Sequence, residues 1–361
     1  MGKKTSRTGS RPSSPTDKGA ERLEGMVVRN TGNSYGVLLT PSLQQGEAGE
    51  RSAVCGYSLP TAGDSEIVDC RIKGTFRLKG IRTTNPVAVG DRVTLLRNSD
   101  GTAYITEIAP RHNYIIRRAS NLSKEASILA ANVDQACLVA TVAHPVTSTT
   151  FIDRFLATTE AYRVPAVLVI NKVDLLADDT ENLELLEALA YLYRSIGYKV
   201  LEVSAATGEG IDALREALAG KITLLSGNSG VGKSTLINRL IPGLDLRTGD
   251  ISDVHDTGMH TTTFSEMFPV PGANAGWLID TPGVRGFGTI EFDQYEVSHF
   301  FPEIFRLSPK CRYGNCTHTH EPACAVREAL ENNYIALSRY NSYLSILADI
   351  NPEKYRPPQG E

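Results

Sequence analysis

GNSGVGKS, residues 227–234, is the stretch that decides the fold, because it lies between the apolar run ITLLS and the helical pattern LINRL. Its glycines allow backbone N–H groups to point toward phosphate oxygens, and the following helix N-terminus adds a favourable dipole. Lys233 is expected to reach the β- and γ-phosphates, and the Ser234 hydroxyl to ligate Mg²⁺. The stretch predicts a phosphate-binding loop in an α/β domain. The residues predicted to contact the nucleotide here are Gly227, Asn228, Ser229, Gly230, Val231, Gly232, Lys233, Ser234 and Thr235.

A second phosphate-site motif, Asp280-Thr281-Pro282-Gly283, ends the apolar run WLID. A carboxylate at the end of a strand near the phosphate loop is placed to hold Mg²⁺. Gly283 is predicted to offer its backbone N–H to the γ-phosphate. The tetrapeptide alone is also good turn chemistry. Its position 46 residues after Ser234 makes it a companion of the phosphate loop.

Two further motifs follow apolar runs and predict recognition of a guanine base. Asn171-Lys172-Val173-Asp174 follows AVLVI, and Ser204-Ala205-Ala206 follows KVLEV. Asp174 can accept hydrogen bonds from the N1–H and amino groups of guanine, a donor pair that adenine lacks, so it favours GTP over ATP. Lys172 would pack over the base and Asn171 would brace the loop. The SAA segment is expected to contact guanine O6.

Apolar runs of strand length alternate with helical patterns from about residue 133. The runs cover residues 136–143, 166–170, 200–204, 222–226 and 277–280. Between them, Leu185, Leu186, Leu189, Leu192 and Tyr193 recur at helical spacing, as do Ile211, Leu214 and Leu218. This alternation is typical of a parallel sheet covered by helices on both faces.

The 361 residues are enough for two or three domains, and 41% of them are hydrophobic and 22% charged, as in ordinary globular proteins. No apolar run approaches 18 residues and the first residues form no hydrophobic segment. We therefore expect neither a membrane span nor a secretory signal, and a cytoplasmic location. The net charge of −4 taken alone argues against binding of nucleic acid.

That net charge is unevenly distributed. Residues 1–22 carry six Lys and Arg against two Asp and Glu, and their Ser- and Pro-rich composition predicts a disordered basic tail. Residues 23–118 carry twelve against nine, and the remaining residues carry nineteen against thirty. A basic part attached to an acidic remainder can signal a nucleic-acid-binding domain.

Short alternating runs separated by turn residues fill residues 25–118 and predict a small all-β barrel or sandwich. On the run VDCRIKGTFRLKG, cations share one parity and apolar residues share the other, so a strand would place them on opposite faces. A solvated outer face would look the same, but the absence of acids from 71 to 82 favours contact with phosphate groups of RNA. The predicted RNA-binding residues are Arg71, Lys73, Arg77, Lys79 and Arg82.

Three of the six cysteines fall within fourteen residues of one another beside two histidines. The spacing Cys311-x4-Cys316-x-His318-x5-Cys324 offers three thiolates and one imidazole, which suit one structural Zn²⁺ ion in a closed tetrahedral site. An iron–sulfur site is less compatible with this donor set, and His320 is an alternative ligand. Around the cluster, Pro322 is expected to open a helix, and Tyr340, Tyr343, Leu344 and Leu347 predict another.

Hydrolysis of GTP needs a positioned water, and Ras-like enzymes use a glutamine just after the DxxG motif. Val284 stands at that place, so unstimulated hydrolysis should be slow. His260, which directly precedes three threonines, is the candidate replacement, although it could instead pack or contact RNA. Of these threonines, Thr262 and Thr263 are favoured over Thr261 as the Mg²⁺ ligand.

The chain order NKVD, SAA, GNSGVGKS, HTTT, DTPG is a circular permutation of the usual GTPase order. With the barrel, the Cys/His cluster and the segments ANVDQ (131–135) and RYNSY (339–343), the sequence resembles the RsgA (YjeQ) family of small-ribosomal-subunit-dependent GTPases. The resemblance implies an OB-fold β-barrel, a circularly permuted α/β P-loop GTPase domain and a helical zinc domain. We assign residues 1–22 to the tail, 23–118 to the OB-fold, 119–289 to the GTPase domain and 290–361 to the zinc domain.

The resemblance also implies a function. The expected protein is a monomeric GTPase that uses Zn²⁺ and Mg²⁺, binds the 30S subunit and its 16S rRNA, hydrolyses GTP to GDP and acts late in assembly of that subunit. Two alternatives remain. One is a GTP-regulated RNA-binding module in which hydrolysis is incidental. The other is a permuted GTPase that acts on the large subunit, against which the barrel and the CxxxxCxH cluster argue.

Overall fold

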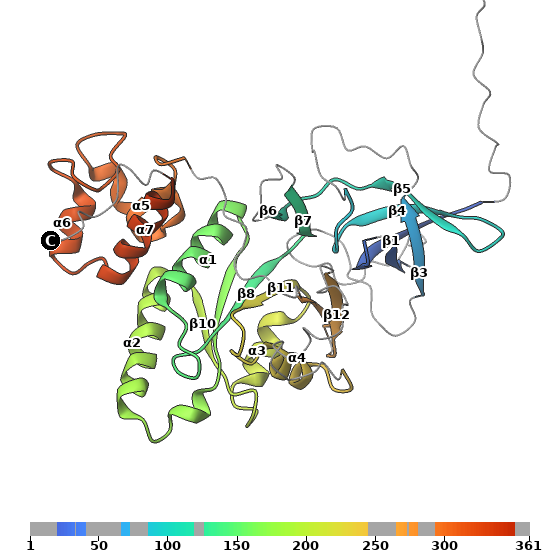
Figure 1. The fold of residues 1–361 in the computed structure, drawn as a ribbon, viewed down its shortest axis with the longest axis horizontal. Helices are drawn as coiled ribbons and strands as arrows, with labels where there is room; N and C mark the ends of the chain where they lie inside the picture. The colour runs from blue at the N-terminus through green and yellow to red at the C-terminus, as the bar shows by residue number, and fades with distance from the viewer. Residues whose placement is uncertain are drawn as a thin grey trace, which may run out of the picture.

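In a computed structural model, the protein has three parts arranged in a row, with a central α/β domain between a β-barrel and a helical domain (Figure 1). The structure describes residues 20–32, 34–40, 66–72, 86–118, 126–244, 265–272, 274–280 and 293–350. In these residues no helix is both long enough and apolar enough to cross a membrane.

The N-terminal part is a closed barrel of five strands. Their order is β1-β2-β3-β5-β4, and β4 pairs back with β1 to close the ring. Gly25 lies where β1 pairs with both β2 and β4, and a Cβ there would come within 2.5 Å of the Leu38 carbonyl oxygen, so a side chain has no room at this point. The closed ring confirms the predicted barrel. The strands are β1 (Glu21–Asn30), β2 (Tyr35–Leu39), β3 (Ile67–Ile72), β4 (Arg92–Arg97) and β5 (Ala103–Ile108).

The central domain is built on five parallel strands in the order β10-β9-β8-β11-β13, with β12 antiparallel at one edge. Apolar side chains point to both faces of these strands, as the continuous apolar runs predict. The parallel arrangement is therefore confirmed, but the antiparallel β12 was not expected. The strands are β8 (Gln135–Ala140), β9 (Ala166–Ile170), β10 (Lys199–Glu202), β11 (Ile222–Gly227), β12 (Glu266–Val270) and β13 (Gly276–Asp280).

Helices cover both faces of this sheet. On one face Leu138 belongs to a core that includes Leu156 of α1 and Leu189 of α2, whereas on the other face Val139 packs in a core with α3 and α4. The predicted helix over 211–218 is found at these residues, and the predicted pattern 185–193 lies inside a longer helix. The helices are α1 (Thr149–Tyr162), α2 (Thr180–Ile196), α3 (Ile211–Leu218) and α4 (Lys233–Leu240), and the short 3₁₀ helix η1 is Val173–Leu176.

The C-terminal part is a small helical domain that packs on α1. Its core contains Phe301, Tyr343 and Leu347, and it also takes in Ala157 from α1. The expected helix around Tyr340 is found, but the one expected to start at Pro322 begins three residues later, at Ala325. The elements are η3 (Val297–Phe300), α5 (Pro302–Leu307), η4 (Ser308–Lys310), α6 (Ala325–Glu331) and α7 (Leu337–Ile350).

Strand pairing and a group of buried polar contacts lie at the junction of the barrel and the central domain. Strand β1 pairs with β12 through Arg29 and Glu266, so one sheet continues from the central domain into the barrel. Among these polar contacts, the Arg111 guanidinium donates two hydrogen bonds of 2.6 Å to the buried Asp91 carboxylate. Asn132 donates from Nδ2 to the Gly90 carbonyl at 2.9 Å. The ANVDQ segment thus begins at a domain junction.

Two boundaries differ from the sequence-based assignment. Strand β1 begins at Glu21, and Arg22 pairs with Leu96 of β4, so these two residues belong to the barrel and not to the tail. Strands β6 (Tyr114–Arg118) and β7 (Ala126–Ala131) lie on the two sides of the expected boundary at 118 and form a separate two-stranded sheet, which an isolated bridge from Ala130 to Val89 links to the N-terminal part. Composition averages over many residues, and it cannot place a boundary that one pair of strands decides.

Candidate functional site: a nucleotide site and a metal centre

The nucleotide-binding motifs meet at the carboxyl ends of neighbouring parallel strands. The phosphate loop follows β11, the NKVD segment follows β9 and the SAA segment follows β10. Asn171 links all three, because its Nδ2 donates to the Val231 carbonyl at 2.9 Å and its Oδ1 accepts from the Ala205 N–H at 3.0 Å. The side chain is buried. The expected bracing role of Asn171 is therefore visible as two hydrogen bonds between loops distant in sequence.

The phosphate loop has the backbone that the glycines permit. Gly227, Gly230 and Gly232 have φ values of 151°, 80° and 90°. A Cβ on Gly232 would lie 2.5 Å from Asn171 Nδ2, so this position has room only for glycine. Lys233 begins α4, and its Nζ donates to the carbonyls of Gly227 and Asn228, both at 2.6 Å. Burial lowers the pKa of Lys233, and the nearby Asp280 acts in the opposite direction.

Two oxygen donors of the predicted cation site lie on adjacent elements. Ser234 is half-buried in the first turn of α4, and Asp280 is half-buried at the end of β13. Asp280 pairs in register with Leu225 of β11, the strand that leads into the phosphate loop. Hydroxyl and carboxylate oxygens suit a hard divalent cation. Thr235, predicted to contact nucleotide, is exposed.

The base-recognition residues lie beside the loop that follows β8. Lys172 has a left-handed backbone with φ of 65°, and its Nζ donates to the His144 carbonyl at 2.5 Å. Val173 and Asp174 begin η1 and are half-buried. Ser204 and Ala205 are buried, and Ser204 Oγ accepts from the Thr207 N–H, whereas Ala206 is exposed. The link from Lys172 to His144 had no signal in the sequence, since it uses a backbone carbonyl.

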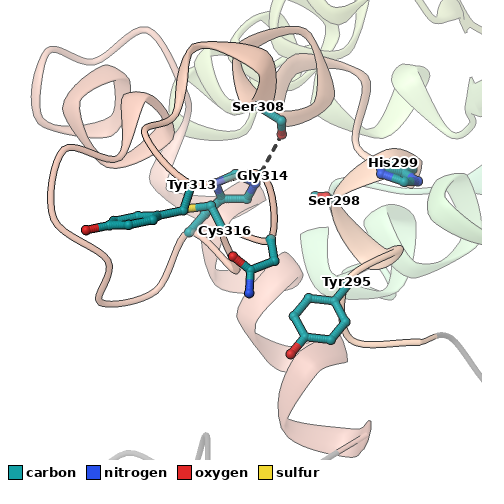
Figure 2. Close-up of a pocket in the computed structure, with 9 residues that line it drawn as sticks. Tyr295, Ser298, His299, Ser308, Tyr313, Gly314 and Cys316 are labelled. Carbon is teal, nitrogen blue, oxygen red and sulfur yellow. Dashed lines mark hydrogen bonds between the residues drawn. The ribbon is translucent and has the colours of Figure 1, made fainter.

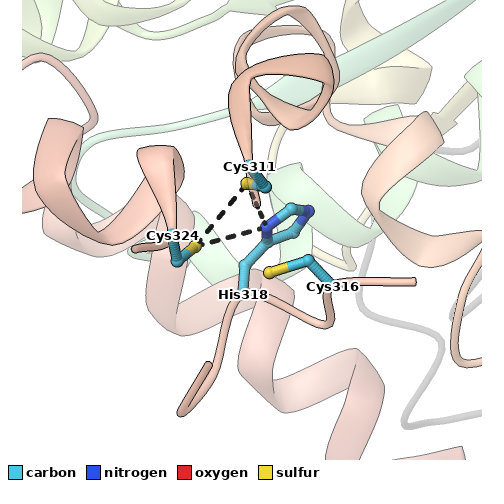
Figure 3. A group of neighbouring side chains, drawn as sticks. All are labelled: Cys311, Cys316, His318 and Cys324. Carbon is cyan, nitrogen blue, oxygen red and sulfur yellow. Dashed lines mark hydrogen bonds between the residues drawn. The ribbon is translucent and has the colours of Figure 1, made fainter. Parts of the chain in front are cut away.

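The predicted metal ligands come together in the C-terminal domain (Figure 3). One donor atom from each of Cys311, Cys316, His318 and Cys324 lies within 4.8 Å of the others. His318 Nδ1 is 3.6 Å from Cys311 Sγ and 3.5 Å from Cys324 Sγ, and these sulfurs are 3.9 Å apart. A tetrahedral ion with bonds of about 2.3 Å to sulfur and about 2.05 Å to nitrogen requires edges of about 3.8 and 3.6 Å. The cluster therefore fits a metal ion such as zinc.

Ser308 contacts the His318 ring (Figure 2), and Glu321 holds the backbone of the loop that carries it. Ser308 Oγ donates to the Ile304 carbonyl and lies 3.0 Å from His318 Nε2, so Nε2–H donates to Ser308 and Nδ1 is left for a metal. Glu321 accepts from the backbone N–H groups of Thr317, Thr319 and His320. Burial opposes ionisation of Glu321, but hydrogen bonds led by those from Thr317 lower its pKa to about 2. The sequence analysis missed both groups.

His320, the alternative ligand, is exposed and bonds to Thr319 through Nδ1, outside the cluster. Exchange of Cys316 for serine is expected to abolish stoichiometric metal binding, because only three donors remain, whereas His320→Ala should bind about one ion per chain. Elemental analysis of the purified variants measures this directly. Loss of metal from His320→Ala with retention by Cys316→Ser would mean that the cluster is not the site.

Several predicted residues lie outside the part of the chain that the structure describes. Arg71 is described, and it is exposed on the outer face of β3, as its parity predicts, two residues from Asp69 on the same face. The predicted residues that lie outside the described part are His260, Thr261, Thr262, Thr263, Gly283, Val284, Lys73, Arg77, Lys79 and Arg82.

A buried ionic cluster, which the sequence analysis missed, fastens the helical domain to the central domain. Arg339 and Asp153 are both 0% exposed and are joined at 2.8 Å. Arg339 Nε also donates to Glu303 at 2.7 Å, and Tyr193 of α2 donates to Asp153 Oδ1 at 2.7 Å. Burial raises the pKa of Asp153, and Arg339 counteracts this. Only the RYNSY segment, which contains Arg339, hinted at the cluster in the sequence.

The fold and the two sites together define a class: a GTPase with a circularly permuted α/β domain, preceded by a barrel and followed by a domain with a Cys₃His metal cluster. Comparisons with known proteins give the family. The family model for the RsgA GTPase matches residues 108–290, and that for the RsgA N-terminal domain matches residues 57–105. The chain belongs to the RsgA GTPase family, and it is therefore a GTP hydrolase.

Relatives and solved structures agree along almost the whole chain. The small ribosomal subunit biogenesis GTPase RsgA of Bacteroides fragilis is 56% identical over 92% of this chain and 99% of its own length. The protein of that name in Porphyromonas gingivalis is 56% identical over 93% and 99%. The crystal structure of YjeQ from Thermotoga maritima is 33% identical with a TM-score of 0.69 over 91% and 99% of the two chains. YloQ, a circularly permuted GTPase, is 26% identical with a TM-score of 0.66 over 96% and 100%.

Proposed function

We propose that this GTPase binds the 30S ribosomal subunit in its GTP state, acts late in assembly of that subunit and leaves after hydrolysis. The observation that supports the enzymatic part is the Asn171 side chain, which ties the phosphate loop and the SAA segment to the NKVD segment. The relatives that are 56% identical are named for biogenesis of the small ribosomal subunit, which supports the choice of subunit. A ribosomal partner would put the protein at work in the cytoplasm, and we propose that it acts as a monomer.

In this proposal the nucleotide is bound with Mg²⁺. Lys233 contacts the β- and γ-phosphates, Ser234 and Asp280 hold the cation, and Thr262 or Thr263 completes its ligands in the GTP state. Gly283 donates its backbone N–H to the γ-phosphate, and His260 positions the attacking water in place of the absent glutamine. The Cys₃His cluster holds one Zn²⁺ with a purely structural role, since four protein donors leave no position open for substrate.

The basic face of the barrel would contact 16S rRNA. Arg71 is exposed on β3, and the cations at 73, 77, 79 and 82 follow it in sequence without an intervening acid. Because such contacts neutralise phosphates, binding should weaken as salt concentration rises.

The test is GTP hydrolysis by the full-length protein, measured alone, with purified 30S subunits and with purified 50S subunits. We expect stimulation by orders of magnitude with 30S subunits, because the usual water-positioning glutamine is missing and the partner must complete the site. No stimulation by either subunit would favour the alternative of an RNA-binding module with incidental hydrolysis. Preferential stimulation by 50S subunits would assign the protein to the large subunit.

Exchange of Asp174 for asparagine is expected to weaken GDP binding by about 100-fold, equivalent to about 2.7 kcal/mol, because two hydrogen bonds to a charged acceptor are lost. ADP binding should stay weak and unchanged. Calorimetric titration of both nucleotides measures the difference. The control is Asp178→Asn, an exposed carboxylate in the same segment. Equal GDP affinities for the two variants would contradict the role of Asp174.

A further inference from the structure

The SAA segment begins a tight turn between β10 and α3, residues 204–208, which we call the SAA turn. The Gly208 N–H donates to the Ser204 carbonyl at 2.9 Å, and the Thr207 N–H donates to Ser204 Oγ at 3.0 Å. These bonds make the turn one compact unit, so a displacement of Thr207 carries the rest of its backbone along. The position of this unit therefore decides where the SAA backbone lies relative to a bound base.

A side chain of α4 holds the SAA turn. Arg239 Nη2 donates to the Thr207 carbonyl at 3.0 Å. Gly208 leaves room for the guanidinium, since a Cβ at this position would lie 2.4 Å from Arg239 Nη2. A charged donor makes a stronger hydrogen bond to a carbonyl than a neutral donor does. The turn is thus fastened to α4 at Thr207.

The helix that holds the SAA turn is also the helix that starts at the phosphate loop. Lys233 begins α4, and Arg239 lies in its last turn. Asn171 makes a second link between the same two segments, from the Val231 carbonyl to the Ala205 N–H. The parts of the site expected to contact phosphate and base are therefore connected at two points, and Arg239 provides one of them.

A second arginine makes a bond of the same kind between α3 and α4. Arg215 of α3 donates from Nη2 to the Arg239 carbonyl at 3.0 Å, and its Nη1 pairs with Asp212. Of the two arginines, Arg239 alone bonds to the SAA turn within the part of the chain that the structure describes. The two side chains therefore allow the positioning of the turn to be separated from the packing of the helices.

We propose that Arg239 is a positioning residue that holds the SAA turn against O6 of the bound guanine. It acts on the nucleotide through the Thr207 carbonyl and the backbone of the turn. The inference rests on the proposed function, because it assumes the guanine nucleotide that this function requires. Asp174 then recognises the N1–H and the amino group of the base, whereas Arg239 sets how firmly O6 is held.

The test is calorimetric titration of the full-length, metal-loaded protein with GDP and two analogues. Thioguanosine diphosphate keeps the donors for Asp174 but presents sulfur, a weak acceptor, in place of O6, so the wild type should bind it more weakly than GDP. Inosine diphosphate keeps O6 but lacks the amino group. Arg239→Met should raise the Kd for GDP and for inosine diphosphate by about 5- to 10-fold, the net effect of one hydrogen bond. The Kd for thioguanosine diphosphate should stay almost unchanged, because its contact at this position is already weak.

The matched control is Arg215→Met, which removes a bond of the same length between the same helices and should leave all three Kd values unchanged. Both arginines reach the surface, so thermal unfolding of the two variants should be close to that of the wild type. Equal losses for all three nucleotides in Arg239→Met, or the same losses in Arg215→Met, would show that Arg239 serves only the packing of the helices. These results would overturn the proposal, as would an unchanged Kd for GDP or equal binding of GDP and its thio analogue by the wild type.

The titrations contain no ribosomal subunits, so their outcome is separate from the test of the proposed function. If 30S subunits stimulate hydrolysis by the wild type but the expected pattern of Kd values is absent, only this inference fails. If they do not stimulate it, the proposed function fails, whatever the titrations show.

Discussion

Exchange of Lys233 for methionine is expected to reduce GTP hydrolysis by about 100- to 1,000-fold, both alone and with subunits. The substitution keeps the length of the side chain but removes the one charge that α4 presents at the phosphate loop. A fixed cation that stabilises charge developing on the phosphates contributes to the transition state in this range. Single-turnover hydrolysis at saturating GTP measures the effect without contributions from product release.

The two hydrogen bonds from Lys233 to Gly227 and Asn228 bear on the outcome. Methionine cannot donate them, so part of the loss could come from a rearranged loop. GDP binding separates the causes, because a disordered loop weakens the binding of GDP as well as catalysis. The control is Lys199→Met, an exposed lysine on β10. Hydrolysis by Lys233→Met at the rate of this control would contradict the assignment.

Exchange of Arg339 for methionine is expected to lower the free energy of unfolding of the helical domain by about 3–5 kcal/mol. It leaves Asp153 buried without its counter-charge, and breaking a buried ion pair from one side costs about this much. Glu303 would also lose its partner, whereas Tyr193 would keep its hydrogen bond to Asp153 Oδ1. Urea denaturation followed by helical circular dichroism measures the change.

Two further variants give this prediction its control. Arg215→Met removes an exposed pair with Asp212, whose side chain is almost fully exposed, and should cost no more than about 1 kcal/mol. Adding Asp153→Leu to Arg339→Met removes the stranded charge and should recover much of the lost stability. A loss in Arg339→Met no larger than in Arg215→Met would show that the buried pair does not hold the domains together.

The nucleotide-binding motifs could be recognised because each of them is continuous in sequence. A strand, a glycine loop and the start of a helix are encoded within about fifteen residues. The apolar run before NKVD likewise places that motif at the end of a strand of the sheet. The Cys₃His cluster was predictable for the same reason, since all four residues lie between residues 311 and 324. The residues that position these groups were not, because Ser308 and His144 act through a hydroxyl and a carbonyl that no pattern distinguishes.

Contacts between distant segments account for what the sequence left open. The pairing of β1 with β12 rests on a single register pair, Arg29 with Glu266, and nothing in either strand specifies the other. The edge strand β12 was missed because its run, EMFPV, contains a proline that argues against a strand. Asp153 and Arg339 are 186 residues apart, and each alone is an ordinary charge on a helix.

Because Asp153 and Arg339 are far apart in sequence, the two partners of this ion pair are synthesised at different times. Helix α1, which carries Asp153, emerges before the phosphate loop and long before α7. Chains fold from the N-terminal side as they are made. The newly formed central domain therefore exposes the Asp153 carboxylate until Arg339, near the end of the chain, has been synthesised. A copy that stops short of residue 339 keeps an uncompensated acid on the surface where the last domain should dock. A truncated copy thus differs from a finished one in that its Asp153 carboxylate lacks the guanidinium of Arg339.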